Sequence, residues 1–532
     1  MSGPPAMSSR MRSIVALFPV ALVACASQGP SPRAPGARTP MSAACDAVDG
    51  TRCLLPWPSN TFTVADPATP AGLRVSIALR SLPVLDNPAP LNRLDGFSVA
   101  STLAAGFPEA LAPGLAGQKQ TTAVRLLSFR ADPEVPLRLH VVADGTSEAS
   151  LLLACPMRPL ASDTDCVAVV LDEVQPARGG RFETPRPVQL AVGVATAATD
   201  EERALVAYHA PTRALLARAG IDGQRVLRAW DFTTRSAASV ARPLALMRAQ
   251  ALDAVDAGAL EVQVLSATPR AGGGLEVRGR VGGLPRFIND AGVLELGDEG
   301  LPVMTGVHEA PFRAVLPVGN GALPVVVFGH GTGNSVNDTG LDDELLATGA
   351  AKLNLEFAGW TGTSVPTTFL GFEHIFSGSE RSTAGLAQSS IDASALEAAL
   401  GAQLGAVLTS PTLAGQQNPA AGRTFDAERL AYFGSSLGGT LDFAHAQAEP
   451  RIHAAVLNVP GAGCGQFLLH AEQWGPLDVI FAASTPSAID RARAAHRVPR
   501  KRVGGGAAGG RASDLRRPAD GLRLSRRAVN DD

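Results

Sequence analysis

Several features that mark other classes of protein are missing from this sequence of 532 residues. Positive charge is not in excess, because 46 Lys and Arg residues stand against 49 Asp and Glu residues, and nucleic-acid-binding domains need a basic surface. Cysteine and histidine are scarce, and no pair of them repeats at the spacing of metal ligands. We therefore expect no nucleic-acid partner, no metal ion and no cofactor.

Long apolar runs are also missing, apart from one short run near the N-terminus. A transmembrane helix needs about 20 consecutive apolar residues, and no stretch of that kind follows. Apolar residues nevertheless make up 45% of the chain, which is enough for sizeable cores and excludes disorder over the whole length. The length allows about two to four domains.

The short apolar run has the form of an export signal. Two arginines precede the run Ile14–Val23, which has about half the length that spans a bilayer. The run ends in the motif Leu-Val-Ala-Cys, which resembles the lipobox of bacterial lipoproteins. The resemblance implies a signal peptide at residues 1–24, lipidation of Cys25, and export to the outer membrane or cell surface with a lipid anchor in the membrane. An ordinary cleaved signal with an incidental cysteine is the alternative.

A flexible linker and a set of cysteines follow. Residues 25–44 are rich in Pro, Ser and Gly, which is typical of a solvated spacer. Cys45 lies close to Cys53 in the sequence, as Cys155 does to Cys166, so an oxidising compartment would permit the disulfides Cys45–Cys53 and Cys155–Cys166. Free buried thiols are the alternative.

Residues 45–235 have the pattern of a β-sandwich-like N-terminal domain. Short β-type runs alternate with turn residues, and a helical stretch at 200–219, broken near Pro211, interrupts them. No catalytic constellation is visible, so a structural or ligand-binding module is the favoured interpretation. The expected strands are Leu137–Val142, Ser150–Leu153, Val167–Leu171, Val188–Val194 and Val226–Thr234.

Two short segments of this domain resemble a known family. They are Leu-Leu-Pro-Trp-Pro-Ser-Asn at 54–60 and Trp-Asp-Phe-Thr-Thr at 230–234. Both are similar to the N-terminal part of bacterial extracellular lipases of the virulence-factor type, a family that includes surface lipoproteins with lysophospholipase activity. The resemblance implies a lipase-like hydrolase.

Residues 236–485 have the alternating pattern of an α/β-hydrolase domain. Apolar strand runs at 324–328, 352–357, 430–433 and 453–459 alternate with helical stretches, which predicts a mostly parallel sheet flanked by helices. Three further strand runs, at 260–265, 275–281 and 312–318, precede them. An acidic cluster at 342–344 is expected to stabilise the N-terminus of a helix.

The motif Gly434-Ser435-Ser436-Leu437-Gly438 carries the clearest chemistry. It lies between an apolar strand and a helix, as a nucleophile elbow requires, and Gly434 and Gly438 let the strand and helix approach closely. Only Ser436 has glycine two residues before and two residues after it. The motif therefore predicts Ser436 as the catalytic nucleophile, with an ordinary Gly-rich turn as the alternative.

A second motif, His330-Gly331, follows the strand at 324–328 and resembles the oxyanion loop of α/β-hydrolases. Backbone N–H groups of such a loop stabilise the negative charge that develops on an ester carbonyl under attack. We expect Leu437 and either Gly331 or Thr332 to supply them. The resemblance implies that His330 shapes the loop and is not the general base. The Gly-rich run is not a dinucleotide fingerprint, because Asn334 replaces the third glycine.

The acid and base of a triad are not evident. Four histidines follow Ser436, namely His445, His453, His470 and His496, and none has a convincing context. Residues 486–532 hold many basic residues without apolar periodicity, which predicts a disordered tail. A genuine basic tail and a truncated or frameshifted C-terminus, which would leave Cys464 unpaired, are both open, and we favour the second.

Together these features predict an exported serine hydrolase, an esterase or lipase that acts on acyl-ester or lipid substrates through an acyl-enzyme on Ser436. The apolar segment Phe467–Trp474 is consistent with a lid over a lipid site. The alternative is a non-catalytic surface lipoprotein, a truncated hydrolase that lacks its acid and base and whose β-sandwich binds a ligand.

Overall fold

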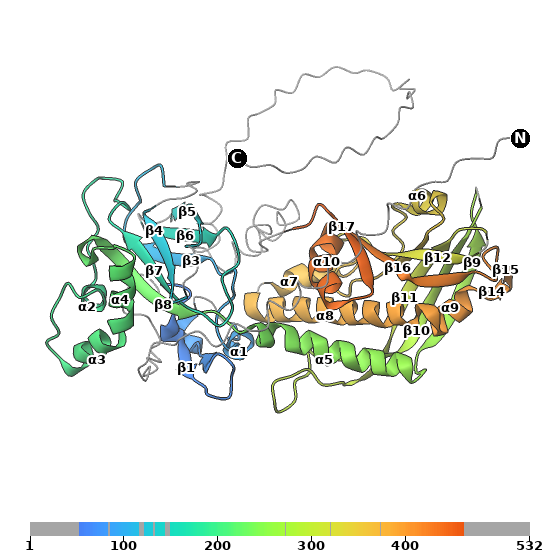
Figure 1. Ribbon diagram of the computed structural model, residues 1–532, viewed down its shortest axis with the longest axis horizontal. Helices are drawn as coiled ribbons and strands as arrows, with labels where there is room; N and C mark the ends of the chain where they lie inside the picture. Colours follow the sequence, from blue (N-terminus) through green and yellow to red (C-terminus); the bar gives the residue numbers. More distant parts are fainter. Residues whose placement is uncertain are drawn as a thin grey trace, which may run out of the picture. The chain divides into compact units, whose positions relative to one another are not determined.

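The computed structural model describes residues 53–82, 86–115, 122–130, 134–143, 149–271, 273–319, 321–372 and 374–461 (Figure 1). The predicted signal peptide, the lipidation site Cys25, the linker, the segment Phe467–Trp474 and the basic tail lie outside these residues. Within them, every helix is too short or too polar to cross a membrane. We call residues 53–235 the N-terminal part and residues 236–461 the C-terminal part.

The N-terminal part contains two antiparallel three-stranded sheets, in the orders β3-β6-β5 and β4-β7-β8, and a small hairpin β1-β2. Its strands are β1 (Thr63–Ala65), β2 (Leu73–Val75), β3 (Leu103–Phe107), β4 (Val124–Ser128), β5 (Leu137–Ala143), β6 (Ser150–Pro156), β7 (Asp165–Leu171) and β8 (Val226–Thr233). Its helices are α1 (Ala89–Asn92), α2 (Arg186–Ala191), α3 (Asp200–Tyr208) and α4 (Ala210–Arg218), with 3-10 turns at Asn60–Phe62, Leu79–Ser81 and Gly223–Arg225.

The two sheets share one apolar core, to which β3, β6, β7 and β8 contribute Phe107, Leu152, Val170 and Phe232. The other face of the sheet β4-β7-β8 packs against α2 and α4, so β7 and β8 are buried along their whole lengths. The sequence predicted a β-sandwich-like domain. The helical layer on the second sheet combines α4, which lies within the predicted helical stretch at 200–219, with α2, which the strand pattern did not predict.

Two predictions in the N-terminal part are wrong. The run Val188–Val194 was expected as a strand, but residues 186–191 form helix α2, with a proline in its first turn. The disulfide Cys155–Cys166 is not formed. Leu152 and Ala154 of β6 point into the shared core, so Cys155 points to the opposite face, whereas Cys166 of β7 points into that core. Cys53 is disulfide-bonded, and its predicted partner Cys45 lies outside the described residues.

The C-terminal part is built on one seven-stranded sheet in the order β17-β16-β12-β13-β11-β10-β9. The strands are β9 (Glu261–Pro269), β10 (Leu275–Arg286), β11 (Gly306–Leu316), β12 (Ala322–Gly329), β13 (Ala351–Leu355), β16 (Thr424–Ser435) and β17 (Ile452–Asn458), and β14 (Thr412–Leu413) and β15 (Gln416–Gln417) form a separate hairpin. The helices are α5 (Ala237–Asp256), α6 (Asp342–Ala347), α7 (Val365–Gly371), α8 (Ile375–Ala398), α9 (Gln403–Leu408) and α10 (Leu437–Ala448), with a 3-10 turn at Ala399–Gly401.

This sheet is mixed, whereas the sequence predicted a mostly parallel one. β13, β12, β16 and β17 are parallel to one another, but β9, β10 and β11 pair in antiparallel fashion. The reason lies in the connections, since no helix separates β9, β10 and β11, and parallel neighbours need a long crossover. The predicted alternation of strand and helix begins only at β12.

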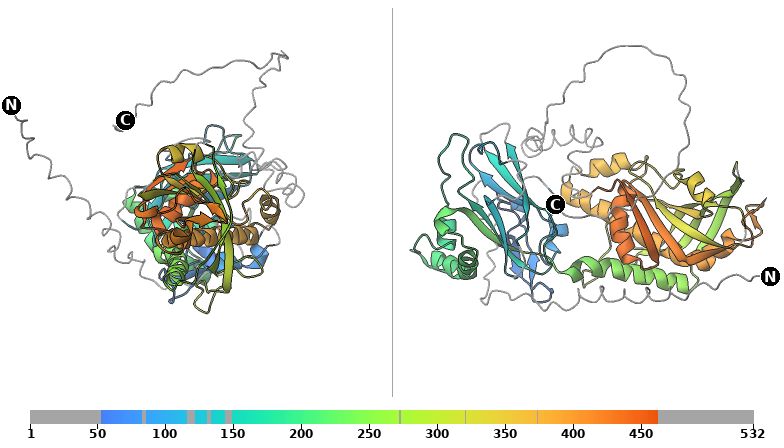
Figure 2. Two further views of the ribbon diagram at one scale, coloured as in Figure 1. Left: turned by 90° about the vertical axis from the view of Figure 1, so that its right-hand side faces the viewer. Right: turned by 45° about the horizontal axis from the view of Figure 1, so that its top comes forward.

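The two faces of the sheet differ in chemistry. Residues Ala351, Leu353 and Leu355 of β13 point into an apolar core that α5 and α8 cover. The alternate residues Lys352 and Asn354 point to the other face, where α6 lies. Helices α5 and α8 run side by side along the apolar face in Figures 1 and 2.

Candidate active site

Ser436 occupies the sharp turn between β16 and α10. Its backbone angles are φ 53° and ψ −106°, a region that residues with a side chain rarely adopt. Two hydrogen bonds hold the turn: the Ser436 N–H donates to the Asn458 carbonyl at 2.9 Å, and the Thr440 N–H donates to the Ser436 carbonyl at 3.0 Å. Such strain persists only where the surroundings impose it, and here it places the serine at the carboxyl end of a parallel strand.

The two glycines of the motif make this turn possible. A Cβ atom on Gly434 would overlap the backbone of Gly438, and a Cβ atom on Gly438 would overlap the backbone of Gly329 at the end of β12. The start of α10 therefore touches both β16 and β12. The predicted elbow glycines thus lie where only glycine fits.

The His330-Gly331 loop lies directly against Ser436, although the two motifs are far apart in the sequence. A Cβ atom on Gly331 would lie 3.4 Å from the Cβ atom of Ser436. The Gly438 N–H donates to the His330 carbonyl at 3.1 Å, which ties the loop to the first turn of α10. The parallel pairing of β12 with β16, in register at Gly329 and Gly434, brings the two segments together.

His330 is fully buried and is used to shape the loop. Its Nε2 atom accepts the Phe357 N–H at 3.0 Å, so the proton of the neutral ring resides on Nδ1, which donates to the Gly331 carbonyl at 2.7 Å. Burial lowers the pKa of His330, which keeps the ring neutral. With both nitrogens engaged, His330 is not placed to take a proton from Ser436.

Three backbone amides near Ser436 are candidates for an oxyanion hole. Leu437 is the first residue of α10, so its N–H has no acceptor within the helix. In the described part of the chain, the amides of Gly331, Thr332 and Leu437 donate to no acceptor. All three residues and Ser436 are partly exposed, so solvent or a ligand can reach them.

The described residues supply no acid or base to Ser436, whose hydroxyl makes no hydrogen bond among them. His445 lies on α10 in a buried pair with Glu397 of α8, with Nε2 and Oε1 3.0 Å apart. His453 lies near the start of β17, at the opposite end from Asn458, which is paired with Ser435. His470 and His496 lie outside the described residues.

Other residues that the sequence singled out have structural partners. Asp342, expected to stabilise the start of α6, is 2% exposed and pairs with Arg313, Lys352 and Arg270, so ion pairing is its main role. The two segments that resemble the lipase family contact each other, because the Trp230 indole N–H donates to the Pro58 carbonyl at 2.8 Å. Asn60 also donates to the Asp231 carboxylate at 2.8 Å.

The sequence interpretation missed three polar residues near the loop that follows β12. Arg313, Lys352 and Asn354 are buried on strands β11 and β13. The available signal was their occurrence inside otherwise apolar strand runs, because buried charges and amides need specific partners.

Comparisons with known proteins give weak similarities. No protein-family model and no curated protein match the chain. Among solved structures, it is similar to acetyl xylan esterase 1 from Thermoanaerobacterium sp. JW/SL YS485, with 16% identity over 46% of this chain and 67% of that one and a TM-score of 0.30. An acetyl xylan esterase from Paenibacillus sp. R4 gives 17% identity, 46% and 68% coverage and a TM-score of 0.27. A CE15 glucuronoyl esterase from Teredinibacter turnerae T7901 gives 15% identity, 38% and 46% coverage and a TM-score of 0.23. TM-scores this low support no conclusion about this chain, so its function has to be argued from its own site.

Proposed function

We propose that the protein is a serine esterase that hydrolyses acyl esters through an acyl-enzyme on Ser436. The observation that carries this proposal is the strained turn at Ser436 with Gly331 beside it, so close that a Cβ atom on the glycine would reach the Ser436 side chain. A strand–turn–helix that presents a serine beside unpaired amides is the arrangement of a nucleophile elbow with its oxyanion loop. Neither feature is needed for a merely structural turn.

In the proposed reaction, the Ser436 oxygen forms a bond to the acyl carbon and the alcohol leaves after receiving a proton. Water then attacks the acyl-enzyme and releases the carboxylic acid. The amides of Leu437 and of Gly331 or Thr332 would donate to the oxyanion in both steps, each contributing about 3 kcal/mol of transition-state stabilisation. A base has to accept the proton of Ser436; His470 and His496 are the candidates that follow it in the sequence.

The test is hydrolysis of p-nitrophenyl esters from acetate to palmitate by the full chain. Ser436→Ala is expected to abolish turnover, whereas the matched control Ser435→Ala, which changes the neighbouring serine of the same motif, should keep most of it. Turnover that survives in Ser436→Ala would refute the assignment. The dependence of kcat/KM on acyl length then distinguishes a lipase from an esterase of short esters.

A non-catalytic role is the second candidate. One observation favours it: among the described residues, nothing hydrogen-bonds the Ser436 hydroxyl. It predicts that purified full-length protein hydrolyses none of these esters and that Ser436→Ala leaves the preparation unchanged. Detectable turnover that depends on Ser436 excludes this candidate.

We also propose that the chain is exported and anchored by a lipid on Cys25, and the support is the lipobox-like motif in the sequence. An anchored enzyme would meet acyl lipids at a membrane surface. Cells that express the protein with radioactive palmitate should yield labelled protein in the membrane fraction, and Cys25→Ser should remove the label. Label retained by Cys25→Ser would contradict the anchor.

A further inference from the structure

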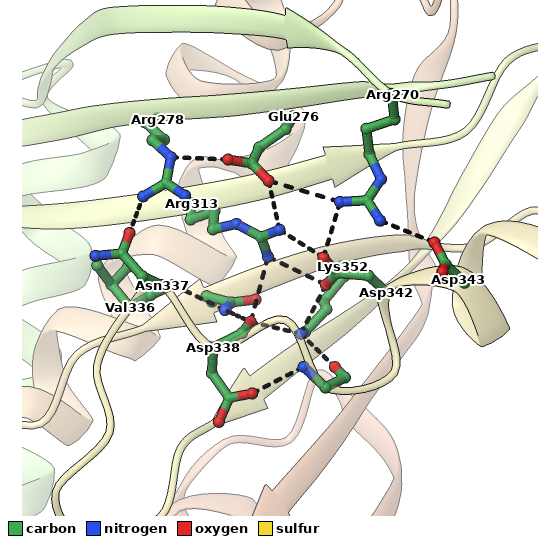
Figure 3. Close-up of polar contacts among 12 residues, drawn as sticks. Arg270, Glu276, Arg278, Arg313, Val336, Asn337, Asp338, Asp342, Asp343 and Lys352 are labelled. Atoms are coloured by element: carbon green, nitrogen blue, oxygen red, sulfur yellow. Dashed lines mark hydrogen bonds and ion pairs between the residues drawn. The ribbon is translucent and has the colours of Figure 1, made fainter. Parts of the chain in front are cut away.

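A network of buried charges lies on the face of the sheet opposite the apolar core, and Figure 3 shows its polar contacts with the segment around Asp338. Arg313 of β11 and Lys352 of β13 are almost completely buried, and both bind the Asp342 carboxylate at the start of α6. Glu276 of β10 accepts from Arg313 at 2.6 Å. Arg270, which directly follows β9, also belongs to the network, because its Nη1 atom is 3.0 Å from Asp342 Oδ2.

The cations of this network also bind neutral groups of the loop. Lys352 has three N–H donors, and its Nζ atom contacts three oxygens: Asp342 Oδ1 at 2.9 Å, the Asp338 carbonyl at 2.9 Å and the Gly340 carbonyl. Its donors are therefore all used, and two of the three bind the backbone of the segment 331–341. Arg313 adds a third contact to this backbone, to the Asp338 carbonyl at 3.3 Å.

Asn354, two residues after Lys352 on the same face of β13, binds the same backbone without a charge. Its Nδ2 atom donates to the Val336 carbonyl at 2.8 Å and to the Asp338 carbonyl at 2.6 Å. The Asp338 carbonyl thus accepts from three side chains. These contacts fix the carbonyls of residues 336, 338 and 340, in the segment that begins with Gly331.

The network lies close to the start of the loop as well as to its end. The Lys352 ammonium group is 4.0 Å from the centre of the Phe328 ring, and Phe328 is separated from His330 by a single residue. His330 in turn holds the first residues of the loop through Phe357 and Gly331. The loop is therefore held by His330 at one end and by Lys352, Arg313 and Asn354 at the other.

Stability alone does not account for this network. Desolvation of buried ion pairs can cancel their attraction, so that apolar residues of similar size are often as stabilising. What apolar residues could not do is bind the backbone carbonyls of a loop. Arg313, Lys352 and Asn354 do bind such carbonyls, so the network is suited to holding the backbone of this loop in one conformation.

We propose that Lys352 and Asn354 are positioning residues that hold the backbone of residues 331–341, and through it the Gly331 and Thr332 amides, in place for the oxyanion. This inference rests on the proposed esterase function and explains how the backbone of its oxyanion loop is held in position. Lys352 and Asn354 do not touch the substrate. They act through the carbonyls of Val336, Asp338 and Gly340.

The first test compares steady-state kinetics of Lys352→Met and Asn354→Leu with the wild type. Both variants keep the size of the side chain and remove its donors to the loop, and Asp342 keeps Arg313 and Arg270 as partners in Lys352→Met. We expect kcat to fall about 10- to 100-fold with KM within about threefold, because loss of one oxyanion donor costs about 100-fold or more. Binding of an alkyl boronic acid, which mimics the tetrahedral intermediate, should weaken in parallel.

The matched control is Asp343→Asn. Asp343 pairs with Arg270 at the exposed rim of the same network but does not bind the loop. Its kcat and boronate affinity should stay within about twofold of wild type. Unchanged kcat in Lys352→Met and Asn354→Leu, with only a lower melting temperature, would overturn the inference and leave the esterase proposal intact.

The second test needs no activity, so it applies also if the esterase proposal fails. Hydrogen exchange measured by mass spectrometry should show faster exchange in peptides that cover residues 331–341 in Asn354→Leu and Lys352→Met. Peptides of β16 and α10 should exchange as in wild type. Equal exchange of the loop in all variants, or a uniform increase over the whole chain, would overturn the inference whether or not the protein is an enzyme.

Discussion

Gly331 lies beside Ser436: a Cβ atom added to the glycine would lie 3.4 Å from that of the serine. This proximity brings the loop after β12 next to the turn after β16. It makes the candidate site a product of two segments that the sequence separates widely. Substitutions in the loop, at Gly331, and beside the turn, at Gly438, should have separable effects on activity and on folding.

Gly331→Ala should reduce activity without unfolding the protein. At 3.4 Å the added methyl group is in ordinary contact with Ser436, but it takes space that an ester would occupy beside the nucleophile. We expect kcat/KM to fall by about tenfold or more, since small misplacements at a reacting centre cost up to about 100-fold, with a nearly unchanged melting temperature. Gly401→Ala, where the added methyl group meets open space, is the control.

Gly438→Ala should instead destabilise the fold. The added methyl group would overlap the backbone of Gly329, which cannot move without shifting β12. Overpacking of this kind costs about 1–3 kcal/mol or more, and urea denaturation followed by circular dichroism measures it. An unchanged unfolding midpoint would mean that β12 and α10 are not packed as closely as described.

His308 predicts a dependence of stability on pH. Its Nε2 atom lies 3.0 Å from Asp392 Oδ1, and although burial lowers the pKa of His308, the hydrogen bond to Asp392 and its negative charge outweigh burial and raise that pKa above 6.5. A group with a raised folded-state pKa contributes stability that is complete below its unfolded pKa and is lost as the pH rises through the folded value.

The free energy of unfolding of wild type minus that of His308→Gln should therefore be largest below pH 6.5 and should shrink as the pH rises through the folded-state pKa. Urea titrations across this range measure it. His453→Gln, which changes an exposed histidine of β17, is the control for replacing a histidine elsewhere in the chain. A difference that grows with rising pH would contradict the ion pair.

Trp230→Phe should lower the stability of the N-terminal part and leave the candidate active site intact. The indole N–H of this buried residue donates to the Pro58 carbonyl at 2.8 Å, so phenylalanine keeps an aromatic ring, although a smaller one, and removes the bond. The expected loss is about 1–3 kcal/mol, the range for a buried hydrogen bond with one partner left unpaired. Thermal unfolding measures the loss, and ester turnover at low temperature should be unaffected.

Sequence pattern was most informative where one segment determined its own structure. The wholly apolar run before Gly329 and the Gly-x-Ser-x-Gly motif predicted β12, β16 and α10, because burial on both faces and tight turns leave clear marks. The helix pair α3 and α4 was also expected, with its break at His209 beside Pro211.

Relations between segments were harder to predict. Cys155 and Cys166 are close in sequence, but Cys166 points into the core between the two sheets and Cys155 points away from it. Which way each side chain points depends on strand register and not on spacing in the sequence. The apolar run that contains Val188 and Leu190 was predicted as a strand because it is apolar. The prolines at its start favour the helix that forms there. The antiparallel half of the large sheet follows from the short connections between β9, β10 and β11.

The most direct measurement is the reaction of full-length protein with a fluorophosphonate, followed by mass spectrometry of the labelled peptide. If Ser436 is an activated nucleophile, the adduct should map to Ser436, should form in Ser435→Ala and should be absent in Ser436→Ala. No adduct, or one that persists in Ser436→Ala, would contradict the esterase proposal.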